Sequence, residues 1–300
     1  MSFRKRLVLA ASLAVVTSSV FAAEIETAKG KVEIAARPAR VAVYDIAAID
    51  TLNAIGVKID GVPAKLYVPR LEPLKDAGEV VGTIFEPDFE ALSALAPELI
   101  IVGGRSSPQL AMTKQVAASI DMTMDDTNLV AQAKARLNTY GVLFGKEAEA
   151  EAAGRKLDEA IGAARTAVKD KGNALIVMTS GLKISTYGKG SRFGWLHAVL
   201  GLPFAVENVE AATHGEAVSF EFISKANPDW LIVLDRAAAI GSGEQGAKAT
   251  LDNELVAGTT AWKKGQVIYL PAADFYIAAG GIQATCQVLA QITDAFAKAQ

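Results

Sequence analysis

The arginines that could bind an anion stand at recurring places in this sequence. Residues 89–105 align without gaps to residues 220–236, and seven of the seventeen aligned positions are identical. Each copy predicts a short helix, a Pro break and a buried strand, followed by Arg105 in the first copy and Arg236 in the second. Because ligands bind outside the carboxyl ends of strands in open α/β sheets, we expect two similar lobes that each present an arginine to a ligand.

A third arginine, Arg192, lies in the glycine-rich stretch 188–194. This stretch fails as a dinucleotide-binding motif, since Phe193 stands at the third glycine position and no acidic ribose partner follows at the right distance. The sequence has no Walker A motif either. We therefore interpret the stretch as a loop that carries Arg192 and leads into a helix at Trp195.

Two further side chains could ligate a metal. His214 stands in a short loop beside Gly215, just before the second repeat copy, where it could reach a ligand. Tyr276 follows the last predicted strand and could present its phenol to a cleft. A purely structural role remains the alternative for both residues. The only other histidine, His197, lies at the start of an amphipathic helix, which favours a structural role for it.

Catalytic chemistry has little support in this sequence. There is no G-x-S-x-G motif, and the only cysteine, Cys286, lies among Ala, Leu and Val in a C-terminal helical pattern that is typical of a packed small side chain. A single cysteine also excludes a disulfide within the chain and a thiolate metal cluster. The sequence therefore predicts that the protein is not an enzyme, and a periplasmic hydrolase is the catalytic alternative.

The elements that must position these residues alternate between strands and helices. The strand candidates are short apolar runs bounded by Gly, Pro or Asp: 40–45, 98–104, 174–180, 229–235 and 266–271. The helical patterns between them are 46–55, 89–95, 195–200 and 220–226. This alternation predicts an α/β fold whose mostly parallel sheets are covered on both faces.

One helical segment differs from the others in length. Residues 146–171 contain no Pro and place Leu157, Ile161, Ala164 and Val168 at intervals of 4, 3 and 4. A helix of about 24 residues would be about 36 Å long. We expect a rigid connector between two Rossmann-like lobes, with an ordinary surface helix as the alternative. The predicted division is a signal peptide at 1–22, an N-terminal lobe at 23–144, a connecting helix at 145–172 and a C-terminal lobe at 173–300.

The N-terminus has the three parts of a secretory signal. A charged start at 4–6 precedes an apolar run at 7–20, and Val20, Phe21 and Ala22 form a cleavage site of small-residue type. An anchor that stays attached is the alternative. No cysteine ends the run, so the sequence offers no site for lipid attachment there. We expect an exported protein that resides in a periplasm.

The net charge of the chain indicates which partners it can bind. The chain has 30 bases and 33 acids, and removal of 1–22 takes three bases and no acids, which changes the net charge from −3 to −6. A protein of this balance, with a pI near 5.6, is not expected to bind nucleic acid.

These motifs resemble those of the periplasmic ferric-siderophore-binding proteins of ABC importers, the class in which one long helix joins two lobes. The resemblance runs from about Arg40 to the C-terminus and is strongest to the branch that binds catecholate siderophores of the petrobactin and tetradentate enterobactin-derivative type. The matching segments are 101–106, 187–194, 213–215, 234–236 and 275–280.

The resemblance implies a binding site between the lobes. The three cleft arginines of the family fall on Arg105, Arg192 and Arg236, and the histidine and tyrosine that ligate iron in some members fall on His214 and Tyr276. Ferric iron prefers anionic oxygen ligands, which catecholates supply, and guanidinium groups can balance the charge of the resulting complex. A hexadentate siderophore needs only the arginines, whereas a tetradentate one leaves two iron positions for the histidine and the tyrosinate.

The resemblance also implies a partner. Glu90 and Glu221 open the equivalent helices of the two repeat copies, where the family docks one glutamate per lobe onto the dimeric inner-membrane permease. A favourable charge at the start of a helix is the alternative explanation for these two acids. We expect a monomer with no permanently bound cofactor that delivers a ferric catecholate siderophore. Another iron chelate, free ferric ion, haem or cobalamin are the alternative ligands.

Overall fold

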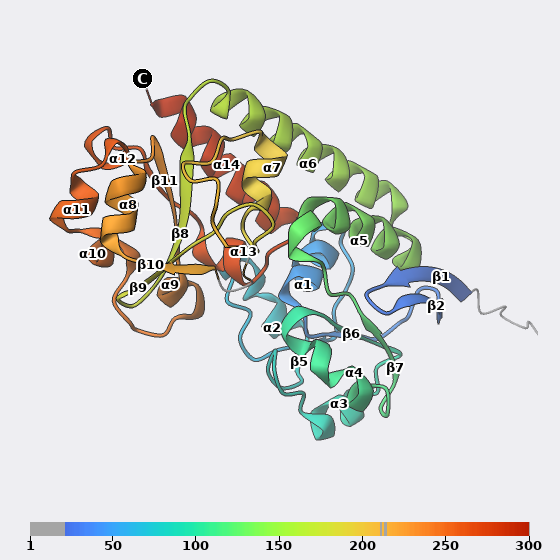
Figure 1. The fold of residues 1–300 in the computed structure, drawn as a ribbon. Coiled ribbons are helices and arrows are strands. Elements are labelled where there is room, and N and C mark those ends of the chain that lie inside the picture. Colours follow the sequence, from blue (N-terminus) through green and yellow to red (C-terminus); the bar gives the residue numbers. More distant parts are fainter. Residues whose placement is uncertain (1–21, 211, 213–214, 300) are drawn as a thin grey trace, which may run out of the picture.

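The computed structural model describes residues 22–210, 212 and 215–299, and these form two α/β lobes beside a pair of long helices (Figure 1). The predicted secretory segment lies outside the described residues except for Ala22, and His214 also lies outside them. No helix in the described part of the chain is long and apolar enough to cross a membrane.

The N-terminal lobe contains a parallel five-stranded sheet with the order β5-β4-β3-β6-β7. Its strands are β3 (Val41–Val43), β4 (Gly61–Val62), β5 (Glu79–Val80), β6 (Leu99–Val102) and β7 (Ala118–Asp121). The strand candidates at 40–45 and 98–104 are confirmed as β3 and β6. These two strands are neighbours, so the residues that follow them lie at the same edge of the sheet.

The C-terminal lobe has a second five-stranded sheet with the order β10-β9-β8-β11-β12. Its strands are β8 (Ala174–Ser180), β9 (Lys183–Thr186), β10 (Glu216–Val218), β11 (Trp230–Asp235) and β12 (Val267–Tyr269). The three predicted strands of this half are confirmed and run parallel to one another. β9 runs antiparallel to β8, because a two-residue turn with Gly181 at φ 56 folds the chain directly back, and β10 in turn pairs antiparallel with β9.

The repeat predicted from the sequence is present in the structure as the same order of a short helix and a buried strand. Helices α3 (Phe89–Leu95) and α8 (Phe220–Ala226) start and end at equivalent positions of the two copies. Each helix ends at a residue in the left-handed region, Ala96 at φ 48 and Asn227 at φ 41, and the Pro that follows stops the helix. The two lobes therefore share the same helix–strand unit.

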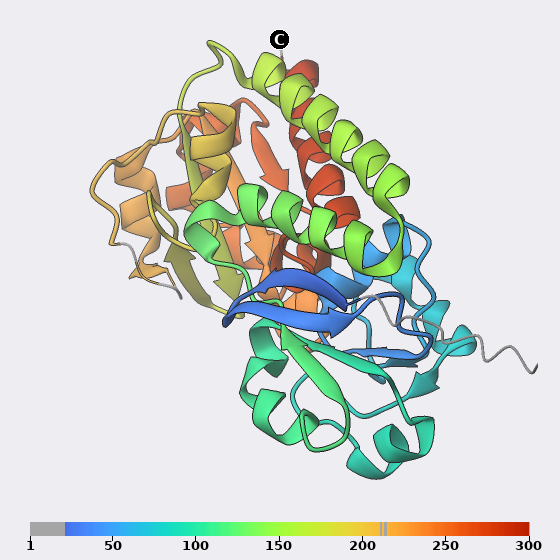
Figure 2. The same cartoon turned by 90° about the vertical axis from the view of Figure 1, so that its right-hand side faces the viewer.

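The connecting helix is confirmed as α6 (Glu147–Val168), whose buried face includes Leu157, Ile161, Ala164 and Val168. Helix α5 (Leu129–Phe144) precedes it, and Gly145 at φ 64 separates the two. The C-terminal helix α14 (Ile282–Lys298) packs beside α6 along one side of the molecule (Figures 1 and 2).

One hydrophobic core extends through both lobes. In β3, Val41 and Val43 belong to this core, which also contains Leu157 of α6 and Leu289 of α14, together with buried residues of the C-terminal sheet. Residues on the opposite faces of the two sheets, such as Ala42 in β3, belong to two smaller clusters. The alternation along the strands therefore turns one face of each sheet toward a common core.

The first helix, α1 (Ile46–Ala54), contacts the start of α14. The hydroxyl of Thr51 accepts from the amide of Ile282 at 3.3 Å, and the carboxylate of Asp50 accepts from the amide of Ala284 at 3.0 Å. These bonds satisfy amides that a helix start leaves without intrahelical partners. The C-terminal helix is thereby attached to the N-terminal lobe.

An antiparallel hairpin that was not predicted from the sequence stands at the start of the N-terminal lobe. It consists of β1 (Ala22–Thr27) and β2 (Gly30–Ala35) and packs against α5 (Figure 2). Its turn is attached to β7 because the amide of Ala28 donates to the carbonyl of Asp121 at 2.8 Å.

Short helices fill the remaining connections. They are η1 (Pro69–Leu71), α2 (Leu74–Ala77), η2 (Gly104–Gln109), α4 (Leu110–Thr113), η3 (Asp126–Asn128), α7 (Trp195–Leu200), α9 (Arg236–Ile240), α10 (Ala247–Leu251), α11 (Glu254–Ala257), α12 (Thr260–Lys263) and α13 (Ala272–Tyr276).

Candidate binding site between the lobes

The three arginines singled out in the sequence converge on Tyr276, the last residue of α13. Arg105 Nη2 and Arg192 Nη2 donate to the carbonyl oxygen of Tyr276 at 3.1 and 2.9 Å. Arg236 Nε donates to the phenol oxygen of the same residue at 3.3 Å. One arginine from the N-terminal lobe and two from the C-terminal lobe therefore meet at one tyrosine.

The ends of two strands position Arg105 and Arg236. Arg105 follows β6 in η2, where the amide of Gly104 donates to the hydroxyl of Thr123 at 2.9 Å and so holds the turn. Arg236 follows β11 directly as the first residue of α9, and its Nη1 donates to Ser180 Oγ at the end of β8 at 3.2 Å. The repeated unit thus delivers both arginines to carboxyl ends of strands, as predicted.

A tightly folded loop positions Arg192. Ser191 Oγ donates to the carbonyl of Gly188 at 2.7 Å, and a Cβ on Gly194 would lie 2.2 Å from that same carbonyl oxygen. Only glycine therefore fits at position 194 in this conformation. The glycine-rich stretch is a loop that leads into α7, as predicted, and the guanidinium of Arg192 lies 4.8 Å from the ring centroid of Tyr276.

Aromatic side chains support the site from the C-terminal lobe. The ring centroid of Phe193 lies 4.6 Å from that of Phe275, 4.7 Å from that of Tyr187 and 6.4 Å from that of Tyr276. Trp195 continues the group at 6.0 Å from Phe275. No sequence motif marks this cluster, although Phe193 follows Arg192 and Phe275 precedes Tyr276 in the chain.

The charges around Tyr276 favour its phenolate. Burial raises the pKa of the phenol, but the hydrogen bond from Arg236 and the positive charges of Arg192 and Arg105 outweigh this effect and hold the pKa below its usual 10. The guanidinium of Arg105 also lies 5.1 Å from the ring centroid. Burial and the like charge of Arg192 lower the pKa of Arg105, although a guanidinium stays protonated in proteins.

A carboxyl group that the sequence analysis did not identify lies near Arg105. Asp45 follows β3 and caps α1 by accepting from the amide of Ala47 at 3.2 Å. Its Oδ2 is so near Gly103 that a Cβ on that glycine would lie 2.7 Å away. Burial raises the pKa of Asp45 to about 6, although the charge of Arg105 acts in the opposite direction.

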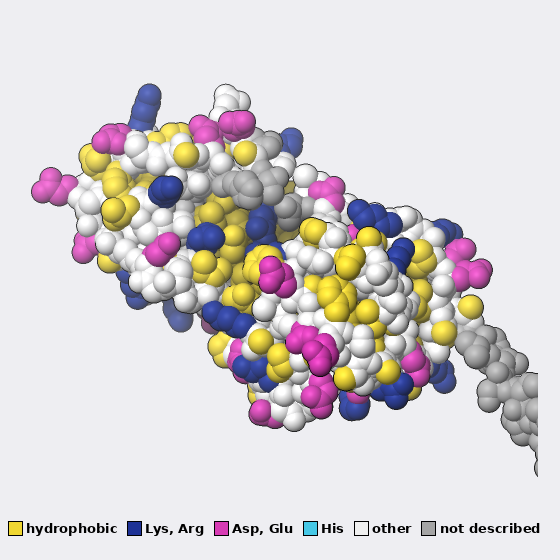
Figure 3. All heavy atoms as spheres, turned by 90° about the horizontal axis from the view of Figure 1, so that it is seen from below, with side chains coloured by type: hydrophobic (Ala, Val, Ile, Leu, Met, Phe, Trp, Pro, Cys, Tyr) yellow, Lys and Arg dark blue, Asp and Glu magenta, His cyan; other side chains and the backbone are white. Residues whose placement is uncertain are grey.

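The surface is hollowed where the two lobes meet (Figure 3). Hydrophobic side chains and Lys or Arg side chains gather in this hollow. Arg105, Arg192, Arg236 and Tyr276 are each half-buried, so each side chain keeps some exposed surface at this place. The site is therefore a cleft of positive character between the lobes.

Of the two histidines, only His197 lies among the described residues. His214 lies outside the described residues, but its neighbour Gly215 packs against the site, since a Cβ there would lie 2.7 Å from Tyr187 Cζ. His197 is buried, bonds the carbonyl of Leu202 through Nδ1 at 2.8 Å, and stacks on Phe204 with a ring-centroid separation of 3.9 Å. Burial lowers the pKa of His197 to about 4, so the structural role predicted for it is confirmed.

Glu90 and Glu221 occupy exposed first turns of the equivalent helices α3 and α8. The side chain of Asp88 caps α3 by accepting from the amide of Glu90 at 3.0 Å, whereas Ser219 caps α8. The hydrogen bond from Ser219 lowers the pKa of Glu221.

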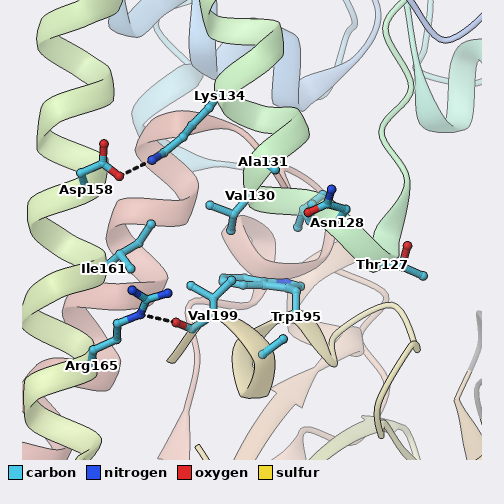
Figure 4. Close-up of a pocket in the computed structure, with 12 residues that line it drawn as sticks. Thr127, Asn128, Val130, Ala131, Lys134, Asp158, Ile161, Arg165, Trp195 and Val199 are labelled. Atoms are coloured by element: carbon cyan, nitrogen blue, oxygen red, sulfur yellow. Dashed lines mark hydrogen bonds and ion pairs between the residues drawn. The ribbon is translucent and has the colours of Figure 1, made fainter. Parts of the chain in front are cut away.

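A separate pocket of about 400 Å³ lies between α5, α6 and α7 (Figure 4). Its charged groups have partners within the protein: Lys134 pairs with Asp158, and Arg165 Nε donates to the carbonyl of Val199. Trp195 lines this pocket, but none of the side chains that converge on Tyr276 does.

Two α/β lobes beside a long helix, with a cationic cleft between the lobes, form the architecture of a substrate-binding protein. Residues 41–273 match the periplasmic binding protein family, and the chain belongs to that family.

Individual relatives resemble the chain over most of its length. The petrobactin-binding protein YclQ of Bacillus subtilis is 34% identical over 274 residues, which cover 90% of this chain and 86% of that protein. Its crystal structure has a TM-score of 0.88 and 32% identity, and the match covers 93% of this chain and 99% of that one. The ferric-anguibactin-binding protein FatB of Vibrio anguillarum is 31% identical over 266 residues, which cover 86% of this chain and 82% of that protein. The periplasmic catecholate-siderophore-binding protein VctP of Vibrio cholerae has a TM-score of 0.85 and 30% identity, and the match covers 91% of this chain and all of that one.

Proposed function

We propose that this protein captures a ferric catecholate siderophore in the cleft between its lobes and delivers it to an inner-membrane ABC permease dimer. It acts as a monomer and makes or breaks no covalent bond in its ligand. The observation that carries the proposal is the convergence of Arg105, Arg192 and Arg236 on Tyr276.

The charge of the site fits an anionic iron chelate. Catecholate oxygens bind ferric iron and leave the complex with net negative charge. Guanidinium groups can donate several hydrogen bonds to such oxygens in fixed directions, and a cluster of them places positive potential where the ligand arrives. Haem and cobalamin do not call for three converging arginines, and among anionic iron chelates we prefer a ferric catecholate because VctP, whose structure matches this chain with a TM-score of 0.85, is named for a catecholate siderophore.

The phenol of Tyr276 fits direct contact with iron. Its pKa is already depressed by the arginines, and a ferric ion would displace the phenolic proton. For a tetradentate siderophore, Tyr276 and His214 would supply the two remaining iron ligands. For a hexadentate siderophore, the arginines alone would hold the complex. The iron arrives and leaves as cargo, and no cofactor stays bound.

The relatives support this class of ligand. Their names assign petrobactin to YclQ, ferric anguibactin to FatB and a catecholate siderophore to VctP.

We further infer that a signal peptide at 1–22 is cleaved and carries no lipid, that the protein resides in the periplasm, and that Glu90 and Glu221 dock onto the permease. The division into lobes at 23–144 and 173–300, with a connecting helix at 145–172, is retained as part of the proposal.

Tryptophan fluorescence tests the ligand class, since Trp195 lies within the aromatic cluster beside the site. The purified protein is titrated with ferric mono-, bis- and tris-catecholates, ferric citrate, haem and cobalamin. We expect saturable quenching and retention of colour through desalting with the ferric catecholates, and weaker quenching in Trp195→Phe. Retention of haem or cobalamin, with no ferric catecholate retained, would overturn the proposal.

A further inference from the structure

We propose that Arg70 is a positioning residue for Tyr276, because it works with Asp50 to fix the segment 274–284 to the N-terminal lobe. The role of Tyr276 as a ligand contact rests on the proposed function, whereas the attachment itself rests on contacts within the protein.

Arg70 lies in η1 of the N-terminal lobe and binds acids from two different parts of the chain. Its Nε donates to Asp50 Oδ1 of α1 at 3.1 Å, and its terminal nitrogens pair with Asp50 and with Asp274 of α13. The side chain of Asp50 is 0% exposed and that of Asp274 is 11% exposed, so water reaches neither carboxylate freely. Asp274 stands two residues before Tyr276, on the same short helix.

Asp50 holds the other end of the segment. Its Oδ2 accepts from the amide of Ala284 at 3.0 Å, and its backbone carbonyl accepts from Gln283 Nε2 at 3.0 Å. A Cβ on Gly281 would lie 2.6 Å from the same Oδ2, so the backbone approaches the carboxylate closely. The segment is therefore attached to the N-terminal lobe at 274 and at 283–284, and Tyr276 lies between these attachments.

The contacts that hold Tyr276 come from both lobes, although its place in the sequence suggests the C-terminal lobe alone. Tyr276 belongs to the C-terminal half of the sequence, and α13 packs there against α9 and β11, yet its segment is also attached to the N-terminal lobe. Arg192 and Arg236 reach it from the C-terminal lobe. Lys65, which precedes η1 in the N-terminal lobe, makes a second contact with the C-terminal lobe. Its Nζ donates to the carbonyl of Ile240 at 2.6 Å, and Ile240 is the last residue of α9, the helix that Arg236 begins.

Loss of the guanidinium would leave two largely buried carboxylates without their shared counter-ion. Breaking a buried pair by removing one partner is costly because the remaining charge stays unsolvated. Without Arg70 nothing would bridge Asp274 to Asp50, so α13 would lose this attachment to α1, and Tyr276 would leave its place among the arginines.

The test compares Arg70→Met, Arg70→Lys and the control Arg155→Met, since Arg155 forms only an exposed pair with Glu151 on α6. Hydrogen exchange of residues 272–285 is measured without ligand, and dissociation constants are measured for a ferric bis-catecholate and a ferric tris-catecholate.

We expect Arg70→Met to accelerate exchange in this segment. It should weaken bis-catecholate binding about 10- to 100-fold, the cost typical of losing a group that orients a metal ligand, with a smaller effect on the tris-catecholate. Arg70→Lys should recover part of the loss, and Arg155→Met should match the parent.

Two results would overturn the inference. One is unchanged exchange at 272–285 in Arg70→Met, which would mean that Arg70 does not hold the segment. The other is equal weakening of both ligands together with faster exchange throughout the protein, which would mean a general loss of stability. If the parent binds no ferric catecholate, the proposed function fails, and the exchange measurement still decides whether the attachment exists.

Discussion

Arg105 and Arg192 come from different lobes yet donate to the same carbonyl oxygen, that of Tyr276. Their like charges repel, as the lowered pKa of the half-buried Arg105 reflects in part. An anion placed between these guanidinium groups would relieve the repulsion and accept further hydrogen bonds. The site is therefore electrostatically prepared for a ligand of negative charge.

Single substitutions test the arginines. Arg105→Ala, Arg192→Ala and Arg236→Ala should each weaken ferric catecholate binding by roughly tenfold to a hundredfold, the effect of losing a charge-assisted hydrogen bond. Fluorescence titration measures the affinity, and Arg155→Ala is the matched control. If all three variants bind as tightly as the parent, these arginines do not form the site.

Iron coordination is tested by the double variant His214→Ala, Tyr276→Phe. It should lose affinity for a tetradentate ferric siderophore and shift its charge-transfer band, because two iron positions lose their protein ligands, while hexadentate complexes are little affected. Tyr269→Phe, in strand β12, serves as the control. Equal losses for both kinds of ligand would mean that these residues line the cleft without touching iron.

The ionisation of Tyr276 gives a pH-dependent prediction. Its phenol should ionise below pH 10, ahead of Tyr44, Tyr140, Tyr187 and Tyr269, whose pKa values burial raises. Because the folded pKa is the lower one, this group stabilises the fold fully above its unfolded pKa, and the contribution disappears as the pH falls through the folded pKa.

Ultraviolet absorbance of tyrosinate follows this ionisation. Tyr276→Phe should remove its component, and Arg236→Met should move it to higher pH because the hydrogen bond to the phenol oxygen is lost. An unchanged profile in Tyr276→Phe would contradict the assignment.

Lobe movement on ligand binding should be small. The lobes share one hydrophobic core, and helices α6 and α14 both join them, so a hinge rotation would disturb packed side chains. Small-angle scattering profiles of the ligand-free and loaded protein should nearly superimpose. A large compaction on loading would show that the lobes are free to rotate.

Docking onto the permease is tested through Glu90 and Glu221. The double variant Glu90→Ala, Glu221→Ala should keep its siderophore affinity, while uptake by a reconstituted transporter falls. Glu254→Ala is the matched control, since Glu254 is also an exposed acid in the first turn of a helix but stands outside the repeat. Unchanged uptake in the double variant would leave the two acids as favourable helix starts alone.

The local features of the site could be predicted from the sequence. The repeat located α3, α8, Arg105 and Arg236, because a helix, its stop at Pro and the strand that follows are all encoded by neighbouring residues. The glycine-rich loop around Arg192 was interpreted correctly for the same reason. Burial of His197 followed from the apolar helix pattern around it.

The contacts between distant segments could not be predicted. Arg70 and Asp274 are 204 positions apart, and nothing in either neighbourhood marks them as partners. The attachment of Tyr276 to both lobes depends on how α13 packs, which periodicity does not report. The direction of β9 depends on a two-residue turn, and the hairpin 22–35 was missed although its residues alternate between more and less exposed positions.

The attachment of α14 to α1 has a consequence for the order in which the chain folds. The N-terminal lobe precedes the rest of the chain during synthesis and export, but Asp50 and Thr51 find their partners only in Ala284 and Ile282. The apolar face that α14 covers stays bare until those last residues emerge. The N-terminal lobe therefore completes its packing only after the rest of the chain is available. A chain truncated before residue 282 would leave that apolar face permanently exposed to proteases.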